Sequence, residues 1–362
     1  MKKIIKLFDP YITNDEYVKV KNILKSGFWA SGAGTGNVLL FEKQIKNYIL
    51  TKSCVAVNSG TAALHLALSV IDIKNKQVIL PSLSFVSTAH AIKYNGGIPV
   101  FADIDPKTLN IDVESVKKKI TKKTKVILPV HFGGLSANLD SLKKLSKQHN
   151  CLLIEDAAHA MGANYNGKKI GSHSDIICFS FHPVKNLAMP TGGLISINNK
   201  DHRNMKNILN SRRWCGITDR KDSEYNVKEL GWNYYMSEIS AGIGLVQLKK
   251  LDYMNKLRRK VAKKFANEIN LDNKMPYDKN SVYHFYWILV KNRNKFRQKL
   301  KQNGVETGIH YKPIHMMDFY RTNYSLPHTE EIGNSIVTLP THPNLSDKDV
   351  KRIITLVNTY AK

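Results

Sequence analysis

The chain has 362 residues, a length that corresponds to about two globular domains with a sizeable hydrophobic core. Its hydrophobic and charged fractions are ordinary for a globular protein, and no apolar run approaches the roughly 20 residues of a membrane-spanning helix. Residues 1–12 place lysines before a short apolar patch that Asp9 and Pro10 interrupt. We therefore expect no signal peptide, no membrane partner and a cytoplasmic location.

The formal net charge of +26 allows three kinds of partner: nucleic acid, anionic membranes or phosphorylated substrates. The lysines are scattered over the polar sides of helical patterns, as at 117–119 and 249–250, and no recognisable nucleic-acid-binding module is present. We therefore expect no nucleic-acid partner. The four cysteines have neither C-x-x-C nor zinc-ligand spacing, which predicts reduced structural thiols and no metal site.

The first elements of the chain are an amphipathic helix at 15–26, a glycine-rich loop at 32–36 and a helix from about Val38. The loop has no preceding strand and no Walker lysine, so it is not a P-loop. A short strand at 55–57 then turns through Ser59, Gly60 and Thr61 into a helix. Such a turn points free backbone N–H groups at one spot and favours anion binding, although an ordinary helix cap would have the same pattern.

Strands and helices alternate after this turn. Strands are predicted at 78–81, 98–104, 125–132 and 152–154, with helices at 84–96, 112–120 and 138–148. This alternation predicts an α/β fold with a mainly parallel central sheet and helices on both faces. Ligands of such sheets bind beyond the carboxyl ends of the strands, where Ser59, Phe85 and Asp156 fall. An aromatic residue such as Phe85 could also be part of the core.

The region 151–197 contains the most informative pattern. An apolar strand ends in Glu155 and Asp156, and two short strands at 176–181 and 194–197 bracket Lys185. A strand-end acid and a lysine between strands are what a pyridoxal phosphate (PLP) site requires, since the lysine amine condenses with the cofactor aldehyde and the carboxylate keeps the pyridine nitrogen protonated. Taken singly, strand-end acids and solvated lysines are common.

Several motifs together resemble the DegT-type nucleotide-sugar aminotransferases. They are E-D-A-A-H-A at 155–160, S-F-H-P-V-K at 180–185, the pair Gly192-Gly193, N-S-G-T-A-A-L at 58–64, and G-W-N-Y-Y-M at 231–236 before a long helix. The resemblance covers essentially the whole chain. It implies the type I fold of PLP-dependent transferases, with a large α/β domain at 1–240 and a smaller C-terminal α+β domain at 241–362.

The resemblance assigns cofactor roles to nine residues. Lys185 would form the Schiff base and shuttle the proton, and Asp156 would pair with the pyridinium nitrogen. Ser59, Gly60, Thr61 and Ser180 would hold the phosphate. Phe85 would stack on the ring, and His159 would lie near the ring hydroxyl. Asn233 would reach the neighbouring subunit's cofactor. A homodimer with shared active sites follows.

Five further residues would lie on the substrate side by the same resemblance: Trp29, Ser31, His310, Tyr311 and His315. The segments S-F-H-P-V-K and H-Y-K-P-I resemble enzymes that aminate C4 of a 4-keto-6-deoxyhexose. The chain departs from the family pattern at Pro190-Thr191, where an acidic G-E-G-G is usual, and at Tyr235, where an arginine is usual. Both departures lie near the substrate, so they bear on the identity of the sugar.

The expected function is transfer of an amino group from an amino acid, with glutamate as the donor, to a keto-sugar nucleotide for surface polysaccharide or glycan biosynthesis. One alternative is a PLP-dependent sugar dehydratase of the same fold, although those relatives carry histidine in place of the lysine. The other alternative is a non-catalytic regulator or nucleic-acid binder, for which an intact set of Lys185, Asp156 and Ser180 would be superfluous.

Overall fold

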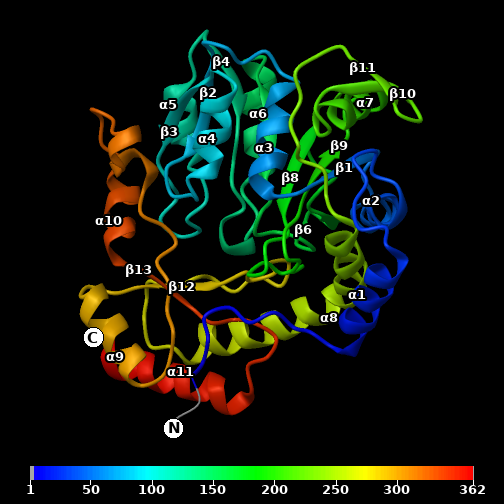
Figure 1. Ribbon diagram of the computed structural model, residues 1–362. Helices are drawn as coiled ribbons and strands as arrows, with labels where there is room; N and C mark the ends of the chain where they lie inside the picture. Colours follow the sequence, from blue (N-terminus) through cyan, green and yellow to red (C-terminus); the bar gives the residue numbers. More distant parts are fainter. Residues whose placement is uncertain (1–3, 362) are drawn as a thin grey trace.

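A seven-stranded sheet forms the centre of the structure, a computed structural model that describes residues 4–361 (Figure 1). The strand order is β1-β9-β8-β5-β4-β2-β3, and β9 alone runs antiparallel to its neighbours β1 and β8. The mainly parallel sheet that the alternation predicts is confirmed. Its strands are β1 (Ser53–Val57), β2 (Gln77–Pro81), β3 (Ile98–Ala102), β4 (Thr124–Ile127), β5 (Leu152–Asp156), β8 (Ile176–Ser180) and β9 (Gly193–Ile197).

Helices cover both faces of this sheet, as the pattern predicts. One core cluster joins the sheet to α3 (Gly60–Ser69), α4 (Ser87–Tyr94) and α7 (His202–Arg212). A second cluster joins the opposite face to α2 (Gly36–Ile49), α5 (Val113–Lys119), α6 (Leu139–Gln148) and the first half of α8 (Glu238–Glu268). The strands are buried on both sides, which explains why they are continuous apolar runs in the sequence.

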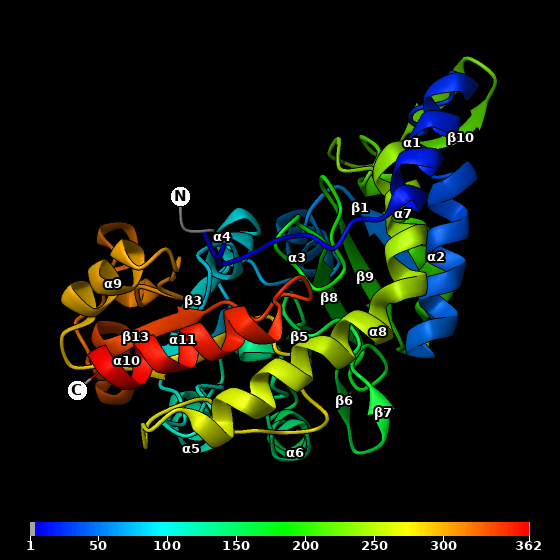
Figure 2. The same cartoon turned by 90° about the horizontal axis from the view of Figure 1, so that it is seen from below.

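The long helix α8 leads from the sheet to the C-terminal part of the chain, which has its own core (Figure 2). This part contains α9 (Arg293–Gln302), α10 (Pro327–Ser335), α11 (Asp347–Tyr360) and the antiparallel pair β12 (Tyr286–Leu289) and β13 (Ile336–Leu339). The N-terminal Ile5 forms a parallel bridge with Val305 and belongs to the same core. The division of the chain at residue 240 stays a prediction.

Polar side chains fix the ends of several helices. Thr13 and Glu16 form a capping box at the start of α1 (Asn14–Ser26), and Gly27 ends this helix in the left-handed conformation. The buried carboxylate of Glu238 accepts hydrogen bonds from the backbone N–H groups of Asn37 (2.7 Å) and Val38 (3.2 Å) at the start of α2. These contacts hold the N-terminal helices against α8.

The remaining elements are short: the hairpins β6 (Asn164–Tyr165)–β7 (Lys168–Lys169) and β10 (Ile217–Lys221)–β11 (Glu224–Val227), and three 3-10 turns at Phe132–Gly134, Ile314–Met316 and Asp318–Tyr320. The hairpin β10–β11 projects from the edge of the molecule beside α7 (Figure 1). Among residues 4–361, none of the helices combines the length and the apolar character that crossing a bilayer demands.

Candidate active site

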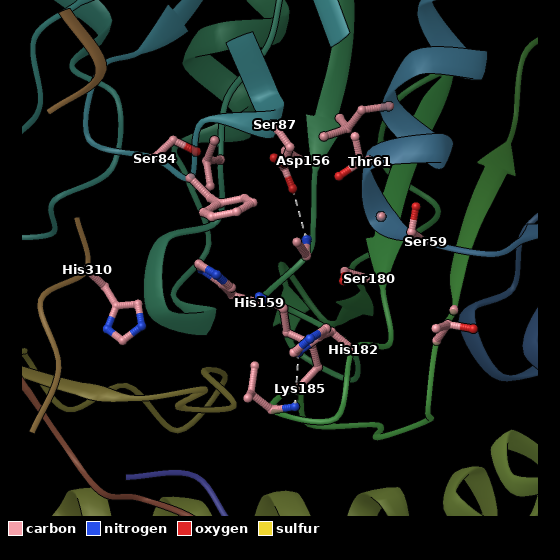
Figure 3. A pocket seen from close by; sticks show the side chains of 18 of the residues that line it. Ser59, Thr61, Ser84, Ser87, Asp156, His159, Ser180, His182, Lys185 and His310 are labelled. Atoms are coloured by element: carbon pink, nitrogen blue, oxygen red, sulfur yellow. Dashed lines mark hydrogen bonds between the residues drawn. The ribbon is translucent and has the colours of Figure 1, made fainter. Parts of the chain in front are cut away.

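A cavity of about 380 Å³ lies at the carboxyl edge of the central sheet (Figure 3). Segments that follow β1, β2, β5 and β8 line it, which is the position that the topology predicts for a ligand. His310 and Tyr311 of the C-terminal part and Phe8 of the N-terminal segment complete the wall. Eight of the nine predicted cofactor residues line this cavity: Ser59, Gly60, Thr61, Phe85, Asp156, His159, Ser180 and Lys185. The predicted substrate residues His310 and Tyr311 line it too, as do Thr191 and Gly192.

The turn before α3 forms one end of the cavity. The Ser59 hydroxyl accepts a hydrogen bond from the Ala62 N–H (3.1 Å), so the turn is a helix cap. Ser59, Gly60 and Thr61 also line the cavity, and anion binding by the turn stays a prediction. A Cβ at Gly60 would lie 2.6 Å from the Ser180 Cβ. Glycine therefore allows the start of α3 to lie directly against Ser180 at the end of β8.

Asp156 lies at the end of β5 with 4% of its surface exposed. Its carboxylate accepts hydrogen bonds from the Thr88 hydroxyl (2.9 Å) and the Ala158 N–H (3.1 Å). Burial raises the pKa of this carboxyl, and these two hydrogen bonds oppose the rise only in part. No salt bridge within residues 4–361 involves Asp156, so a cationic N–H group from a ligand would stabilise its charged form.

Lys185 follows β8 and lies in the same cavity. Burial lowers the pKa of its amine to about 8, and the nearby Asp156 carboxylate opposes part of this shift. A substantial fraction of the amine is therefore neutral near pH 8. A neutral amine can attack an aldehyde and can also accept a proton from carbon, which an ammonium group cannot do.

Aromatic rings form the wall opposite the turn. The side chain of Phe85 is 55% exposed and lies 6.0 Å from the ring of Tyr311, so Phe85 is a cavity residue and not part of the core. The His159 Nε2 atom lies 3.1 Å from the Tyr311 hydroxyl oxygen. His310 is hydrogen-bonded through Nδ1 to Thr338 (2.7 Å), and burial lowers the pKa of its imidazole to about 3.

Four predicted site residues lie outside this cavity within the chain. Trp29, Ser31 and Asn233 are at least partly exposed and do not line this cavity, so their predicted roles stay predictions. His315 is 4% exposed, and its ring nitrogens are hydrogen-bonded to Ser82 (2.6 Å) and Glu330 (3.2 Å). The structure therefore does not bring His315 to the cavity wall, because these two partners hold it behind β2.

The cavity also contains residues that the sequence analysis did not single out. Ser84 and Ser87 follow the carboxyl end of β2, so the rule that identified Phe85 could have identified them as well. Phe8 lies in an extended segment without regular structure, and no sequence signal indicated its position. Val184 precedes the lysine in its motif and lines the cavity beside it.

These residues fit pyridoxal phosphate. The turn at Ser59–Thr61 and Ser180 would hold the phosphate, Asp156 would accept the pyridine N–H, Phe85 would contact the ring, and Lys185 would bind the aldehyde carbon. The fit depends on the buried carboxylate without an ion pair and on the neutral amine in the same cavity.

Comparisons with known proteins agree with this assignment. Residues 10–358 match the DegT/DnrJ/EryC1/StrS aminotransferase family. Protein MJ1066 of Methanocaldococcus jannaschii is 36% identical, covering 97% of this chain and 96% of the relative. Spr1654 of Streptococcus pneumoniae, described as a sugar aminotransferase and solved in PLP and PMP forms, has a TM-score of 0.92, with 28% identity for the PMP form, over 99% of this chain and 98% of the other.

A third similar structure is PseC of Helicobacter pylori, an aminotransferase involved in the biosynthesis of pseudoaminic acid. It has a TM-score of 0.93 and 27% identity, and the match covers 99% of each chain. The family match, the fold and the residues of the cavity lead to one conclusion: the chain belongs to the DegT/DnrJ/EryC1/StrS aminotransferase family, whose members use pyridoxal phosphate.

Proposed function

We propose that this protein transfers an amino group from an amino acid, with glutamate as the donor, to C4 of a 4-keto-6-deoxyhexose linked to a nucleotide, for surface polysaccharide or glycan biosynthesis. The observation that carries the aminotransferase part is the buried Lys185 amine, whose pKa is lowered, in one cavity with Asp156 and the turn before α3. The sugar rests on the motifs S-F-H-P-V-K and H-Y-K-P-I and on the similarity to Spr1654 and PseC.

Lys185 and Asp156 have separate tasks in this proposal. When bound, PLP carries the amino group between the two substrates. The neutral Nζ of Lys185 would remove a proton from the carbon that bears the amino group and deliver it to the carbon on the other side of the nitrogen, because its lowered pKa matches a working pH near 8. Burial raises the pKa of Asp156, and the cationic pyridine N–H would offset this rise, so that the ionised carboxylate would keep the nitrogen protonated. Both groups are enclosed, which strengthens their electrostatic interaction.

We also propose that the active unit is a homodimer with shared sites. Large apolar side chains gather on the connection between α1 and α2, on α2, and on and just after the hairpin β10–β11, and they are exposed in a single chain: Phe28, Trp29, Leu39, Leu40, Tyr225, Val227 and Leu230. These elements lie on one side of the molecule (Figure 2). A second copy of the chain would cover this surface and would bring Asn233 to the phosphate of the partner's cofactor.

The decisive experiment incubates the PLP-loaded protein with glutamate and a panel of 4-keto and 3-keto nucleotide sugars, followed by mass spectrometry. We expect nitrogen from ¹⁵N-labelled glutamate in the product of a 4-keto-6-deoxyhexose. A product that has lost oxygen without gaining nitrogen would instead identify the dehydratase. The absence of reaction with every sugar, in protein whose Lys185 binds PLP, would refute the proposed substrate class.

A further inference from the structure

His159 and Tyr311 form an isolated polar pair in the cavity. The His159 Nε2 atom lies 3.1 Å from the Tyr311 hydroxyl oxygen, and this is the only side-chain hydrogen bond of either residue within residues 4–361. The two residues come from different parts of the fold, since His159 follows β5 and Tyr311 lies beyond α9. Either the imidazole N–H or the phenol O–H could be the donor, so the surroundings of the pair decide the direction of the hydrogen bond.

The imidazole of His159 is held firmly by aromatic neighbours. His284 stacks on it with ring centres 4.5 Å apart and planes inclined by 24°. Phe285 and Phe132 approach the same ring edge-on, with ring centres 5.3 Å and 6.4 Å away. These contacts hold the plane of the ring, and Nε2 lies at the Tyr311 hydroxyl.

The Nδ1 atom of His159 settles the tautomer. It is buried, inaccessible to solvent and without a hydrogen-bond partner among the described residues. A buried N–H without an acceptor is rarer in proteins than a buried acceptor that is not fully used. The proton of the neutral imidazole therefore belongs on Nε2, which donates to the Tyr311 oxygen. Burial lowers the pKa of His159 well below its usual value, so the ring carries only this one proton.

The direction of this hydrogen bond decides what the Tyr311 hydroxyl does. Its oxygen accepts from His159, so its own proton must be donated elsewhere. Burial raises the pKa of the phenol above its usual value, and the proton is therefore retained. Within residues 4–361 the hydroxyl has no hydrogen-bond partner other than His159, and Tyr311 lines the cavity.

We propose that Tyr311 donates a hydrogen bond to an oxygen atom of the bound ligand, and that His159 is the positioning residue that orients this donor. Two ligand oxygens have the required chemistry: the ring hydroxyl oxygen of pyridoxal phosphate and the keto oxygen of the amino acceptor. The assignment to the acceptor rests on the proposed function, whereas the assignment to the cofactor does not.

The test compares Tyr311→Phe with Tyr320→Phe. Tyr320 is a matched control, because its hydroxyl forms a similar pair with His90 Nδ1 (2.6 Å) outside the cavity. If Tyr311 donates to the cofactor oxygen, Tyr311→Phe should change the absorbance spectrum of the substrate-free PLP-loaded protein and the pH titration of that spectrum. Both half-reactions should then also slow by about 10-fold, which corresponds to one hydrogen bond of about 1.4 kcal/mol.

A donor to the keto oxygen of the sugar predicts a different result: the spectrum and the glutamate half-reaction stay unchanged, and only the half-reaction with the sugar slows, again by about 10-fold. Tyr320→Phe should leave all three measurements at wild-type values. If Tyr311→Phe also behaves like wild type in all three, Tyr311 donates to no ligand and the proposal is wrong.

A second measurement tests the tautomer without any substrate. The ¹⁵N NMR spectrum of protein labelled at histidine distinguishes a protonated from an unprotonated ring nitrogen, and His159→Gln identifies the signals. We expect a proton on Nε2 and none on Nδ1. A proton on Nδ1 would reverse the hydrogen bond and overturn the proposal, even if the protein is shown to aminate a sugar.

Discussion

Replacing Asp156 with asparagine would remove the charge beside the pyridine nitrogen while keeping the shape of the side chain. The Ala158 N–H donates to Oδ1 (3.1 Å), so the amide oxygen of asparagine takes this position. The amide NH₂ then faces Thr88, whose hydroxyl can accept it and turn its own proton to Ser84, 2.9 Å away. All hydrogen bonds are retained, and we expect the fold and the binding of PLP to survive.

The loss is therefore electrostatic. A carboxylate in an enclosed site favours the protonated pyridine nitrogen, and this proton stabilises the negative charge that develops when Lys185 removes a proton from carbon. One positioned charge of this kind is typically worth about 3–4 kcal/mol, which corresponds to roughly 100- to 1,000-fold in rate. We expect the glutamate half-reaction of Asp156→Asn to slow by this factor.

The assay is single-turnover conversion of the PLP form to the aminated cofactor by glutamate, followed by absorbance at full cofactor occupancy. Asp103→Asn is the matched control, because Asp103 is a buried acid beyond the end of β3 at the edge of the same sheet, and it accepts a hydrogen bond from Thr329 outside the cavity. This control should lose stability and keep its rate. A rate for Asp156→Asn within a few-fold of wild type would show that Asp156 is a structural acid and that the ring lies elsewhere.

Three other predictions concern the same site. Borohydride reduction of the PLP-loaded protein and peptide mapping should find the pyridoxyl group on Lys185, and a label on another residue would contradict the assignment. Because burial lowers the pKa of Lys185 to about 8, the rate of PLP binding to the cofactor-free protein should rise with pH and level off above about 8, not above 10.5; a plateau only near 10.5 would mean an exposed amine. Mixing Lys185→Ala with Asn233→Ala subunits should restore about a quarter of wild-type activity under random pairing, and no recovery after proven subunit exchange would exclude shared sites.

The sheet and its helices could be predicted because local patterns determine them. The predicted helix at 112–120 is α5 (Val113–Lys119), and the predicted strand at 176–181 is β8 (Ile176–Ser180). The hairpin β10–β11 was not predicted, because nearly all its residues are exposed and no alternation of apolar and polar residues marks its strands. The predicted strand at 125–132 is longer than β4 (Thr124–Ile127), since the chain leaves the sheet before Pro129 and continues into a 3-10 turn.

The candidate site likewise has one part that the sequence predicted and another part that it did not. Lys185 and Asp156 belong to local motifs, and the sequence was sufficient to bring them together at the carboxyl edge of a sheet. His159 and Tyr311 are separated by 152 positions, and their hydrogen bond depends on how the C-terminal part packs against the sheet. Phe8 reaches the cavity because the N-terminal segment crosses to the C-terminal core. Contacts of this kind follow from tertiary packing and have no local signal.

The glycine motifs show why separate pieces of the sequence identify one site. A Cβ at Gly193 would lie 2.2 Å from the Ser59 carbonyl oxygen, and a Cβ at Gly60 would lie 2.6 Å from the Ser180 Cβ. The turn before α3 thus packs against β9 on one side and β8 on the other, and a side chain at either glycine would push this turn away from Ser180. The motifs around Ser59, Ser180 and Gly193 are therefore three parts of a single packing contact, and the phosphate site proposed at this turn would require all of them at once.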